Sequence, residues 1–227
     1  MSVDLKSLDL TRTALILGDL QNDFIHPDGA YGRSGTSDPD IAALPGRVAP
    51  VAQAVRAAGG WVVSTHFILV PGRDGEPFIS PDLKSVRPFL EKGDFLPGGW
   101  GQDLVDELKP ADMRVEKVAF SAFYMSRLEW ILKKADIENL VFTGIVTNGG
   151  VASTLRDAHV RDFKTVLLSD GCAAFGADVH QTAVDALRPV ATVVTCAEFL
   201  AAISYHTREA PANTIAQGVV PDGEGSG

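Results

Sequence analysis

The sequence predicts a three-layer α/β fold, in which helices cover both faces of a doubly wound sheet of about six mainly parallel strands. Two observations carry this prediction. Apolar runs of strand length alternate six times with amphipathic segments of helical length, which is the order that builds a parallel sheet. The strand runs, such as Ala14-Leu-Ile-Leu17, are almost continuously apolar, as strands that are buried on both faces require.

Each predicted strand is followed by one predicted helix. The strands are short apolar runs, and the helices repeat their apolar residues with the spacing of one helix face. In chain order, the strand and helix of each pair are residues 14–17 and 43–58, 61–66 and 102–108, 113–116 and 127–134, 140–145 and 149–162, 164–169 and 177–187, and 191–194 and 197–203.

The length of 227 residues fits one large α/β domain, which we expect to span residues 1–205. Two stretches, 25–37 and 70–101, lack this periodicity and are rich in Gly, Pro and Asp. Loops of that length are often lids or binding loops, and we expect that role here. Residues 206–227 have almost no apolar periodicity and predict either a flexible tail or an arm on a neighbouring subunit.

Composition narrows the class of partner. The formal net charge of −9 and the pI near 5.0 argue against nucleic acid or an anionic membrane. No segment approaches the roughly 20 apolar residues of a membrane span, and the N-terminal residues lack the pattern of a signal peptide. Cys172 and Cys196 form no CxxC pair and are expected to be reduced and buried. We therefore expect a cytoplasmic protein whose partner is a small molecule.

Gly149 and Gly150 stand at the turn between a predicted strand and the helix that follows it. In an open α/β sheet, backbone N–H groups and the positive end of the helix dipole meet a ligand at such a turn. Each glycine in a helix costs roughly 1 kcal/mol against alanine. The pair either serves packing alone or clears space for a ligand to approach the backbone.

Two ionisable residues also follow predicted strands. Asp19 ends the first strand and Lys117 follows the third. Asp19 either lies in the ligand crevice or caps a loop, and Lys117 is either solvated or partly desolvated and paired with Asp19. We take the nearby Asp23 as structural.

Together these segments resemble the isochorismatase-like superfamily of hydrolases, which includes isochorismatases and cysteine amidohydrolases such as nicotinamidases and N-carbamoylsarcosine amidases. The resemblance extends over residues 12–203 and implies the three-layer fold of that superfamily. Its matching stretches are Ala14-Leu-Ile-Leu-Gly-Asp-Leu-Gln-Asn-Asp-Phe24, Lys117-Val-Ala-Phe-Ser-Ala-Phe123, Leu140-Val-Phe-Thr-Gly-Ile-Val-Thr-Asn148, Ser153-Thr-Leu-Arg-Asp-Ala158 and Ser169-Asp170.

The resemblance implies a catalytic centre. The amidohydrolases use an Asp, a Lys and a Cys, and these places fall on Asp19, Lys117 and Gly150. The nucleophilic thiol is therefore missing, and covalent thiol catalysis of the usual kind is not expected. Cys172 lies at a place that looks structural in the family and is not expected to substitute for it.

The isochorismatases resemble this chain in having glycine at the cysteine place. Their resemblance implies that Asp19 protonates an enol ether and that water captures the resulting cation. They carry Ala-His where this chain has Thr147-Asn148, and Trp-Arg-Tyr where it has Val118-Ala119-Phe120. We therefore interpret the chain as a descendant of the amidohydrolase branch that has lost its thiol.

The remaining site predictions concern substrate contacts. Nicotinamidase-like members hold a metal through an Asp and spaced histidines, but His66 has no second histidine within ligand spacing, so we predict no metal and no other cofactor. Arg87 is predicted to clamp an anionic substrate and Trp100 to belong to a lid. The full predicted substrate-binding set is Phe24, His66, Arg87, Trp100, Phe123, Tyr124, Val146, Thr147 and Asn148.

The predicted function is hydrolysis of a small metabolite by Asp19, Lys117 and water. Two alternatives stay open: an amide or ureide hydrolase whose nucleophile position is substituted, and a catalytically silent binding or assembly subunit. The resemblance also implies a homo-oligomer, either a dimer or a tetramer.

Overall fold

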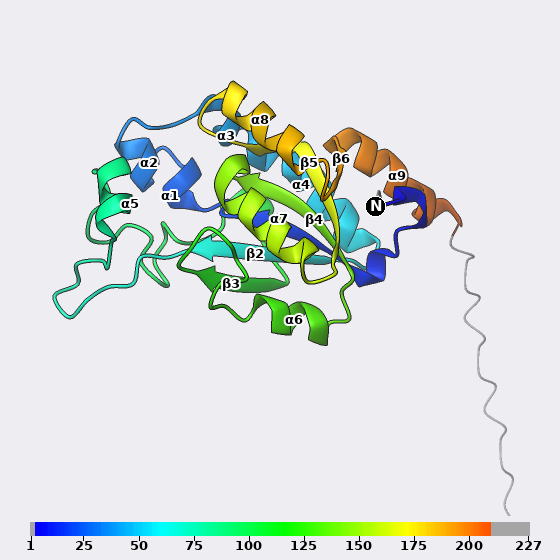
Figure 1. Cartoon of the computed structure of the whole chain (residues 1–227), viewed down its shortest axis with the longest axis horizontal. Helices are drawn as coiled ribbons and strands as arrows, with labels where there is room; N and C mark the ends of the chain where they lie inside the picture. Colours follow the sequence, from blue (N-terminus) through cyan, green and yellow to red (C-terminus); the bar gives the residue numbers. More distant parts are fainter. Residues whose placement is uncertain (1–2, 210–227) are drawn as a thin grey trace, which may run out of the picture.

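The centre of the fold is a parallel sheet with the strand order β3-β2-β1-β4-β5-β6, seen in the computed structural model, which describes residues 3–209 (Figure 1). Every pairing between neighbouring strands in the described chain is parallel. The predicted fold class is therefore confirmed. The strands are β1 (Thr13–Gly18), β2 (Trp61–Phe67), β3 (Met113–Lys117), β4 (Asn139–Ile145), β5 (Lys164–Ala173) and β6 (Thr192–Val194).

The strand order reverses between β1 and β4. The chain runs outward from β1 to β2 and β3 on one side, then returns to β4 beside β1 and continues to β5 and β6. At such a reversal the connections leave in opposite directions, which opens a crevice at the carboxyl ends of the two central strands. Gly144 permits a close approach there, because it has φ of +111° and an added Cβ would lie 2.0 Å from the Gly18 carbonyl oxygen.

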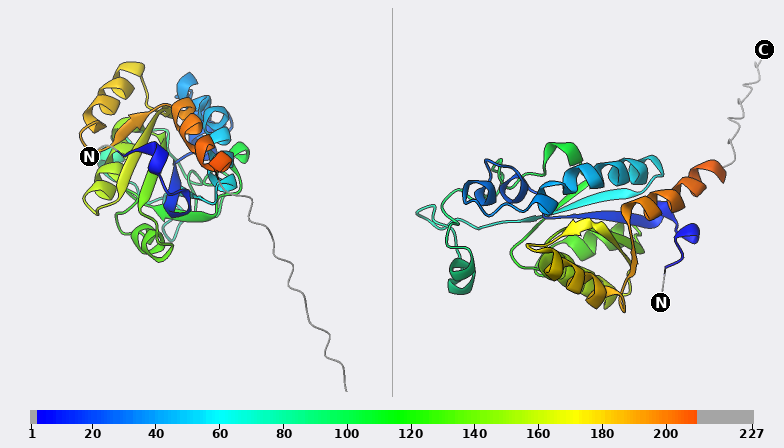
Figure 2. Two further views of the ribbon diagram at one scale, coloured as in Figure 1. Left: turned by 90° about the vertical axis from the view of Figure 1, so that its right-hand side faces the viewer. Right: turned by 90° about the horizontal axis from the view of Figure 1, so that it is seen from above.

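Helices cover both faces of the sheet. Figure 2 shows α4 and α8 on opposite sides of it. One apolar core joins the sheet to α4 and α9, and a second core on the other face joins it to α6, α7 and α8. The helices are α1 (Asn22–Ile25), α2 (Ala30–Arg33), α3 (Pro39–Ala42), α4 (Leu44–Ala57), α5 (Pro81–Val86), α6 (Leu128–Lys134), α7 (Ala152–His159), α8 (Ala177–Leu187) and α9 (Cys196–Glu209), with short turns η1 (Leu5–Ser7), η2 (Leu10–Arg12), η3 (Asp106–Leu108) and η4 (Thr147–Val151).

All six predicted strands are present, but two predicted helices differ. Residues 102–108 form only the short turn η3, because the preceding backbone pairs elsewhere: Leu104 bridges to Gln21, and the Asp103 carbonyl accepts a bond from the Asn22 N–H. The helix predicted over 149–162 is divided, since η4 is a π-helical turn and α7 begins at Ala152 and ends at His159.

The segments predicted as loops contain short helices. Residues 25–37 include α2, and residues 70–101 include α5. The sequence Ser80-Pro81 starts α5, because the Ser80 hydroxyl accepts a bond from the Leu83 N–H at 3.1 Å and proline suits the first helical turn.

The C-terminal helix α9 begins at Cys196 and continues to Glu209, so it includes the first residues of the predicted tail 206–227. The rest of the predicted tail, residues 210–227, lies outside the described residues. Within residues 3–209, no helix combines the length and apolar character needed to cross a membrane.

Candidate active site

Asp19 and Lys117 meet at the crevice. Asp19 follows β1 and Lys117 ends β3, and the Lys117 Nζ lies 2.7 Å from Asp19 Oδ2. Both side chains are almost fully buried, with exposed fractions of 7% and 3%. Lys117 Nζ also donates a hydrogen bond to the Ala119 carbonyl at 3.0 Å. Of the two alternatives for Lys117, the structure therefore has the side chain buried and paired with Asp19.

The environment of Asp19 is unusual for a carboxylate. Its backbone adopts φ of +57°, and its N–H donates to the Thr65 carbonyl at 3.0 Å. Burial raises the pKa of Asp19 above its ordinary value, and the charge of Lys117 opposes that rise. Among the described residues, Asp19 Oδ1 is buried without a hydrogen-bond partner. One carboxylate oxygen is therefore held by Lys117, and the other is free to act on a substrate or a water.

Gly150 lies next to this pair, in the π-helical turn η4. The turn is closed by bonds from the N–H groups of Gly149 and Val151 to the Val146 carbonyl, at 2.9 and 3.2 Å. An added Cβ at Gly150 would lie 3.2 Å from Asp19 Oδ2 and 3.0 Å from the Ile145 carbonyl oxygen. A side chain at position 150 would thus start beside the Asp19 carboxylate.

Thr154 holds this turn in place. Its hydroxyl donates to the Gly150 carbonyl at 2.7 Å and accepts from the Ala122 N–H at 3.0 Å. The bond to Ala122 connects α7 to the segment that follows Lys117. Two parts of the site that are distant in sequence are therefore fixed relative to one another.

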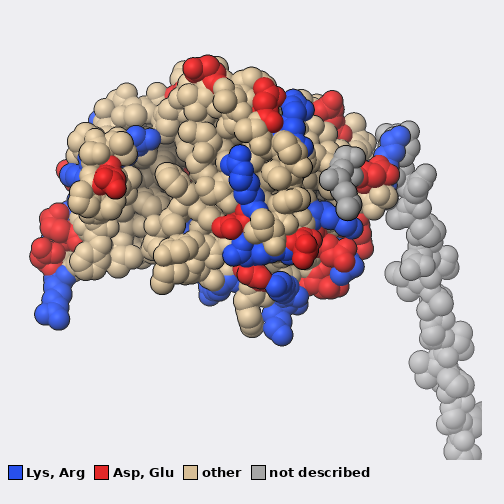
Figure 3. Space-filling model, in the orientation of Figure 1, with Lys and Arg blue, Asp and Glu red and all other residues tan. Residues whose placement is uncertain are grey.

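A cavity of about 480 Å³ opens above Asp19, Lys117 and Gly150. Figure 3 shows a hollowed surface between α5 and α7 with few charged side chains. Its size and apolar walls suit a small molecule. Besides Asp19, Lys117 and Gly150, the lining comprises Phe24, Tyr31, Phe67, Ser80, Asp82, Leu83, Val86, Arg87, Leu90, Phe95, Val118, Ala119, Phe120, Ile145, Val146 and Phe175.

Two cationic side chains line this cavity, Lys117 and Arg87. Lys117 pairs with Asp19, whereas Arg87 has no carboxylate partner among the described residues. Its guanidinium lies 5.7 Å from the centre of the Tyr31 ring and 5.5 Å from that of Phe175. Its Nε donates to the Tyr31 hydroxyl at 2.8 Å. These contacts fix a positive charge in the cavity wall.

The structure brings six of the predicted site residues together. Asp19, Lys117 and Gly150 form the base of the cavity, and the walls include Phe24, Arg87 and Val146. Six others do not line this cavity: His66, Trp100, Phe123, Tyr124, Thr147 and Asn148.

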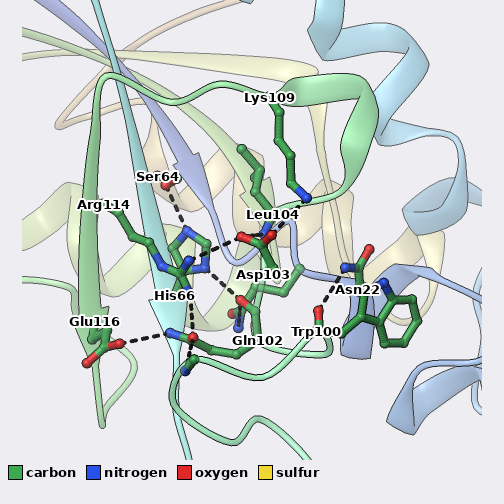
Figure 4. A network of polar contacts seen from close by, with 12 residues as sticks. Asn22, Ser64, His66, Trp100, Gln102, Asp103, Leu104, Lys109, Arg114 and Glu116 are labelled. Carbon is green, nitrogen blue, oxygen red and sulfur yellow. Dashed lines mark hydrogen bonds and ion pairs between the residues drawn. The ribbon is translucent and has the colours of Figure 1, made fainter.

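His66 instead holds a buried polar network (Figure 4). Its Nδ1 lies 2.7 Å from the Gln102 carbonyl oxygen, and its Nε2 lies 2.8 Å from the Ser64 hydroxyl. The side chain of Gln102 contacts Glu116 and Arg114. Burial lowers the pKa of His66 to about 4, so the ring is neutral near pH 7. His66 thus ties β2 to the segment before η3.

This network predicts a pH-dependent contribution to stability. The pKa of His66 is about 4 in the folded chain against an ordinary 6.5, so the unfolded state binds more protons between those values. The free energy of unfolding should therefore fall as the pH drops from 6.5 toward 4. Between pH 7 and 5 we expect the native chain to lose about 2 kcal/mol more than the His66→Gln variant. Urea unfolding at both pH values measures this difference, and equal losses in the two proteins would contradict it.

The other five residues have contacts of their own. Trp100 packs edge-on against His26, with ring centres 5.0 Å apart, and Tyr124 is 55% exposed. Phe123 is buried against Phe163 in the core between the sheet and α7.

The turn residues point away from the cavity. The Thr147 hydroxyl lies 2.8 Å from His180 Nδ1 on α8. Asn148 lines a separate groove between α7 and α8. Thr147 therefore connects η4 to α8.

Most of the aromatic rings that line the cavity are absent from the predicted substrate-binding set. The missed rings are Tyr31, Phe67, Phe95, Phe120 and Phe175. A usable signal was present for some of them, because Tyr31 and Phe95 fall in the two stretches expected to form binding loops, and Phe120 lies three residues after Lys117.

The two cysteines lie outside the cavity lining, and both are buried. Burial raises the pKa of the Cys172 thiol well above its ordinary value and that of Cys196 to about 12. Neither thiol therefore has the environment of a nucleophile. Among residues 3–209, no group of three or more His, Cys, Asp or Glu side chains is arranged to hold a metal ion.

The parallel sheet and the buried Asp–Lys pair at the crevice agree with the isochorismatase-like superfamily that the sequence resembles. The family model described as the isochorismatase domain matches residues 13–199. The chain therefore belongs to the isochorismatase family of hydrolases.

Individual relatives agree with this assignment. The ureidoacrylate amidohydrolase RutB of Caulobacter vibrioides is 33% identical over 187 residues, which cover 78% of this chain and 83% of the relative. RutB of Pseudomonas savastanoi pv. phaseolicola is 35% identical over 185 residues, covering 75% and 74%.

Solved structures show the same fold. A cysteine hydrolase from Pseudomonas syringae pv. phaseolicola 1448A superposes with a TM-score of 0.74 at 25% identity, covering 90% of this chain and 99% of that one. The N-carbamoylsarcosine amidase from Thermoplasma acidophilum gives a TM-score of 0.64 at 25% identity, covering 82% and 96%.

Proposed function

We propose that the chain hydrolyses the C–N bond of a small amide or ureide in the cavity above Asp19, using water and no thiol. The observation that carries this proposal is the buried Asp19–Lys117 pair, 2.7 Å apart, at the base of a cavity that also adjoins a glycine at position 150. The names of the relatives support the bond type, because RutB is an amidohydrolase of ureidoacrylate.

The ionised Asp19 begins the reaction as a base. It takes a proton from a water molecule while the water oxygen bonds to the substrate carbonyl carbon. The C–N bond then breaks, and the proton on Asp19 passes to the leaving nitrogen. The products are an acid and an amine, and Asp19 is ionised again.

Lys117 prepares Asp19 for this role. Its ammonium stabilises the ionised carboxylate, which burial alone would disfavour. The ammonium of Lys117 binds Asp19 Oδ2. The other carboxylate oxygen, Oδ1, has no hydrogen-bond partner among the described residues. The pair therefore supplies a base of defined orientation.

The walls of the cavity position the rest of the substrate. The rings of Phe24, Tyr31, Phe67 and Phe175 offer flat apolar surfaces. Arg87 provides the positive charge that holds an anionic group, in a guanidinium already ordered by two rings. The proposed reaction uses no metal or other cofactor.

The test is hydrolysis after thiol blocking. The native chain is incubated with iodoacetamide and then assayed with ureidoacrylate and simple primary amides. We expect the treated and untreated proteins to turn over substrate at equal rates, because Cys172 and Cys196 are buried with raised pKa values.

The Gly150→Cys variant is the matched control for this test. Its new thiol would lie beside Asp19 in the cavity, so iodoacetamide should label it and abolish its activity. Inhibition of the native chain by the reagent would contradict the thiol-free mechanism. A native chain that hydrolyses nothing but binds ureidoacrylate would support a silent binding protein instead.

A further inference from the structure

A small recess lies beside Gly150, separate from the main cavity but sharing four of its lining residues. Its volume is about 10 Å³, which is close to the space that one water molecule requires. The shared residues are Asp19, Lys117, Ile145 and Gly150. The recess therefore adjoins both the catalytic carboxylate and the substrate cavity.

Two polar groups of the recess have no hydrogen-bond partner within the described chain. One is Asp19 Oδ1, which belongs to a residue only 5% exposed. The other is the hydroxyl of Thr65, which lines the recess from β2. The remaining hydroxyls are already engaged, since Thr143 donates to the Ile16 carbonyl and Thr154 to the Gly150 carbonyl. A buried carboxylate oxygen without a partner is costly, and a bound water would satisfy it.

The glycine at position 150 keeps this place open. An added Cβ would lie 3.2 Å from Asp19 Oδ2 and 3.0 Å from the Ile145 carbonyl oxygen. Any longer side chain would extend from that point beside the carboxylate. The absence of a side chain at position 150 therefore leaves room for a solvent molecule where a side-chain nucleophile would otherwise begin.

We propose that the recess beside Gly150 is a specific water site, and that the water bound there to Asp19 Oδ1 and Thr65 is the attacking nucleophile. The assignment of a site rests on the recess and its two unpartnered groups, whereas the nucleophilic role rests on the proposed function. In the attack, the water oxygen bonds to the carbonyl carbon and its proton moves to Asp19 Oδ1. The C–N bond breaks, and Asp19 returns that proton to the leaving nitrogen.

A pair of glycine variants tests the nucleophilic role with ureidoacrylate as the probe. Gly150→Ala places a methyl group beside Asp19 and should lower kcat by at least about 100-fold, the loss expected when the activated water is displaced. KM should change little, because Gly150 forms only the base of the cavity. Gly149→Ala is the comparison within the same turn. Its Cβ would lie 2.9 Å from Val146 Cγ2 in the cavity wall rather than beside Asp19, so it should raise KM but keep kcat near the native value. Native kcat in Gly150→Ala would overturn the nucleophilic role.

A high-resolution crystal structure of the native chain tests the site independently of activity. We expect one ordered water about 2.8 Å from Asp19 Oδ1, absent from Gly150→Ala crystals in which Asp19 and Lys117 keep their positions. A dry recess in the native crystals would overturn the site. If the water is present but the native chain hydrolyses no substrate, the proposed function fails while the water site stands.

Discussion

The substitution Asp19→Asn is expected to lower kcat for ureide or amide hydrolysis by about 1,000-fold, within the range that a general base contributes. The amide of Asn has nearly the shape of the carboxylate but accepts no proton at neutral pH. Within residues 3–209, Asp19 is also the one carboxylate that pairs with Lys117 at the base of the cavity, so no other carboxylate in this part of the chain is placed to replace it there. Steady-state rates of the native chain and Asp19→Asn measure the effect.

Asp23→Asn is the matched control for this substitution. Asp23 is also buried, but it lies outside the cavity lining and accepts bonds from the N–H groups of Ala30 and Phe95 at 3.0 and 2.6 Å. These contacts agree with the structural role expected from the sequence. We expect Asp23→Asn to lose stability, by about 1–3 kcal/mol for a disturbed buried hydrogen bond, while its kcat stays near the native value. A native rate in Asp19→Asn would remove Asp19 from the mechanism.

Removal of the Lys117 charge is expected to shift the acidic limb of the pH–rate profile upward. Burial raises the pKa of Asp19, and Lys117 opposes the rise. Without that opposing charge, Asp19 should hold its proton to a higher pH. Because the base acts only when ionised, the rate of Lys117→Met should fall steeply below that higher pKa. The profile of kcat/KM against pH measures the shift.

Lys109→Met provides the comparison for Lys117→Met. Lys109 pairs with Asp103 and Asp106 near the surface, away from the cavity. Its loss should leave the acidic limb where it is in the native chain. If Lys117→Met also leaves the limb in place, the limb does not report Asp19 and the assigned base is wrong.

The strand pattern and the meeting of Asp19 with Lys117 were predictable from the sequence. Strands buried on both faces require continuous apolar runs, and such runs are visible without knowledge of the fold. The carboxyl ends of parallel strands lie along one edge of the sheet, so polar residues just after β1 and β3 are brought toward one another. Both predictions depend on local sequence and on a general rule of sheet architecture.

The predicted site residues that do not line the cavity show that local sequence does not determine which way a side chain faces. Side chains alternate between the two faces of a strand. Thr65 and Phe67 line the recess and the cavity, while His66 between them faces the opposite side and bonds to Gln102. His66 was predicted to end its strand and lies one residue before the end of β2 at Phe67, but the face that its side chain occupies depends on the register of the whole sheet.

The aromatic wall depends on long-range packing. Phe24, Tyr31, Phe67, Phe95 and Phe175 come from separate parts of the chain, and their rings contact one another in the folded state. Nothing in the sequence near any one of these residues indicates its partners. Trp100, in contrast, looked suitable for a lid but packs against His26 outside the cavity.

The most direct measurement of a thiol-free hydrolase is the turnover of ureidoacrylate by a chain that contains no cysteine. The variant Cys172→Ala with Cys196→Ala removes both thiols of the sequence and leaves Asp19, Lys117 and Gly150 in place. We predict that kcat of this variant equals that of the native chain. Loss of turnover in a folded cysteine-free chain, or no turnover by the native chain itself, would contradict the proposed function.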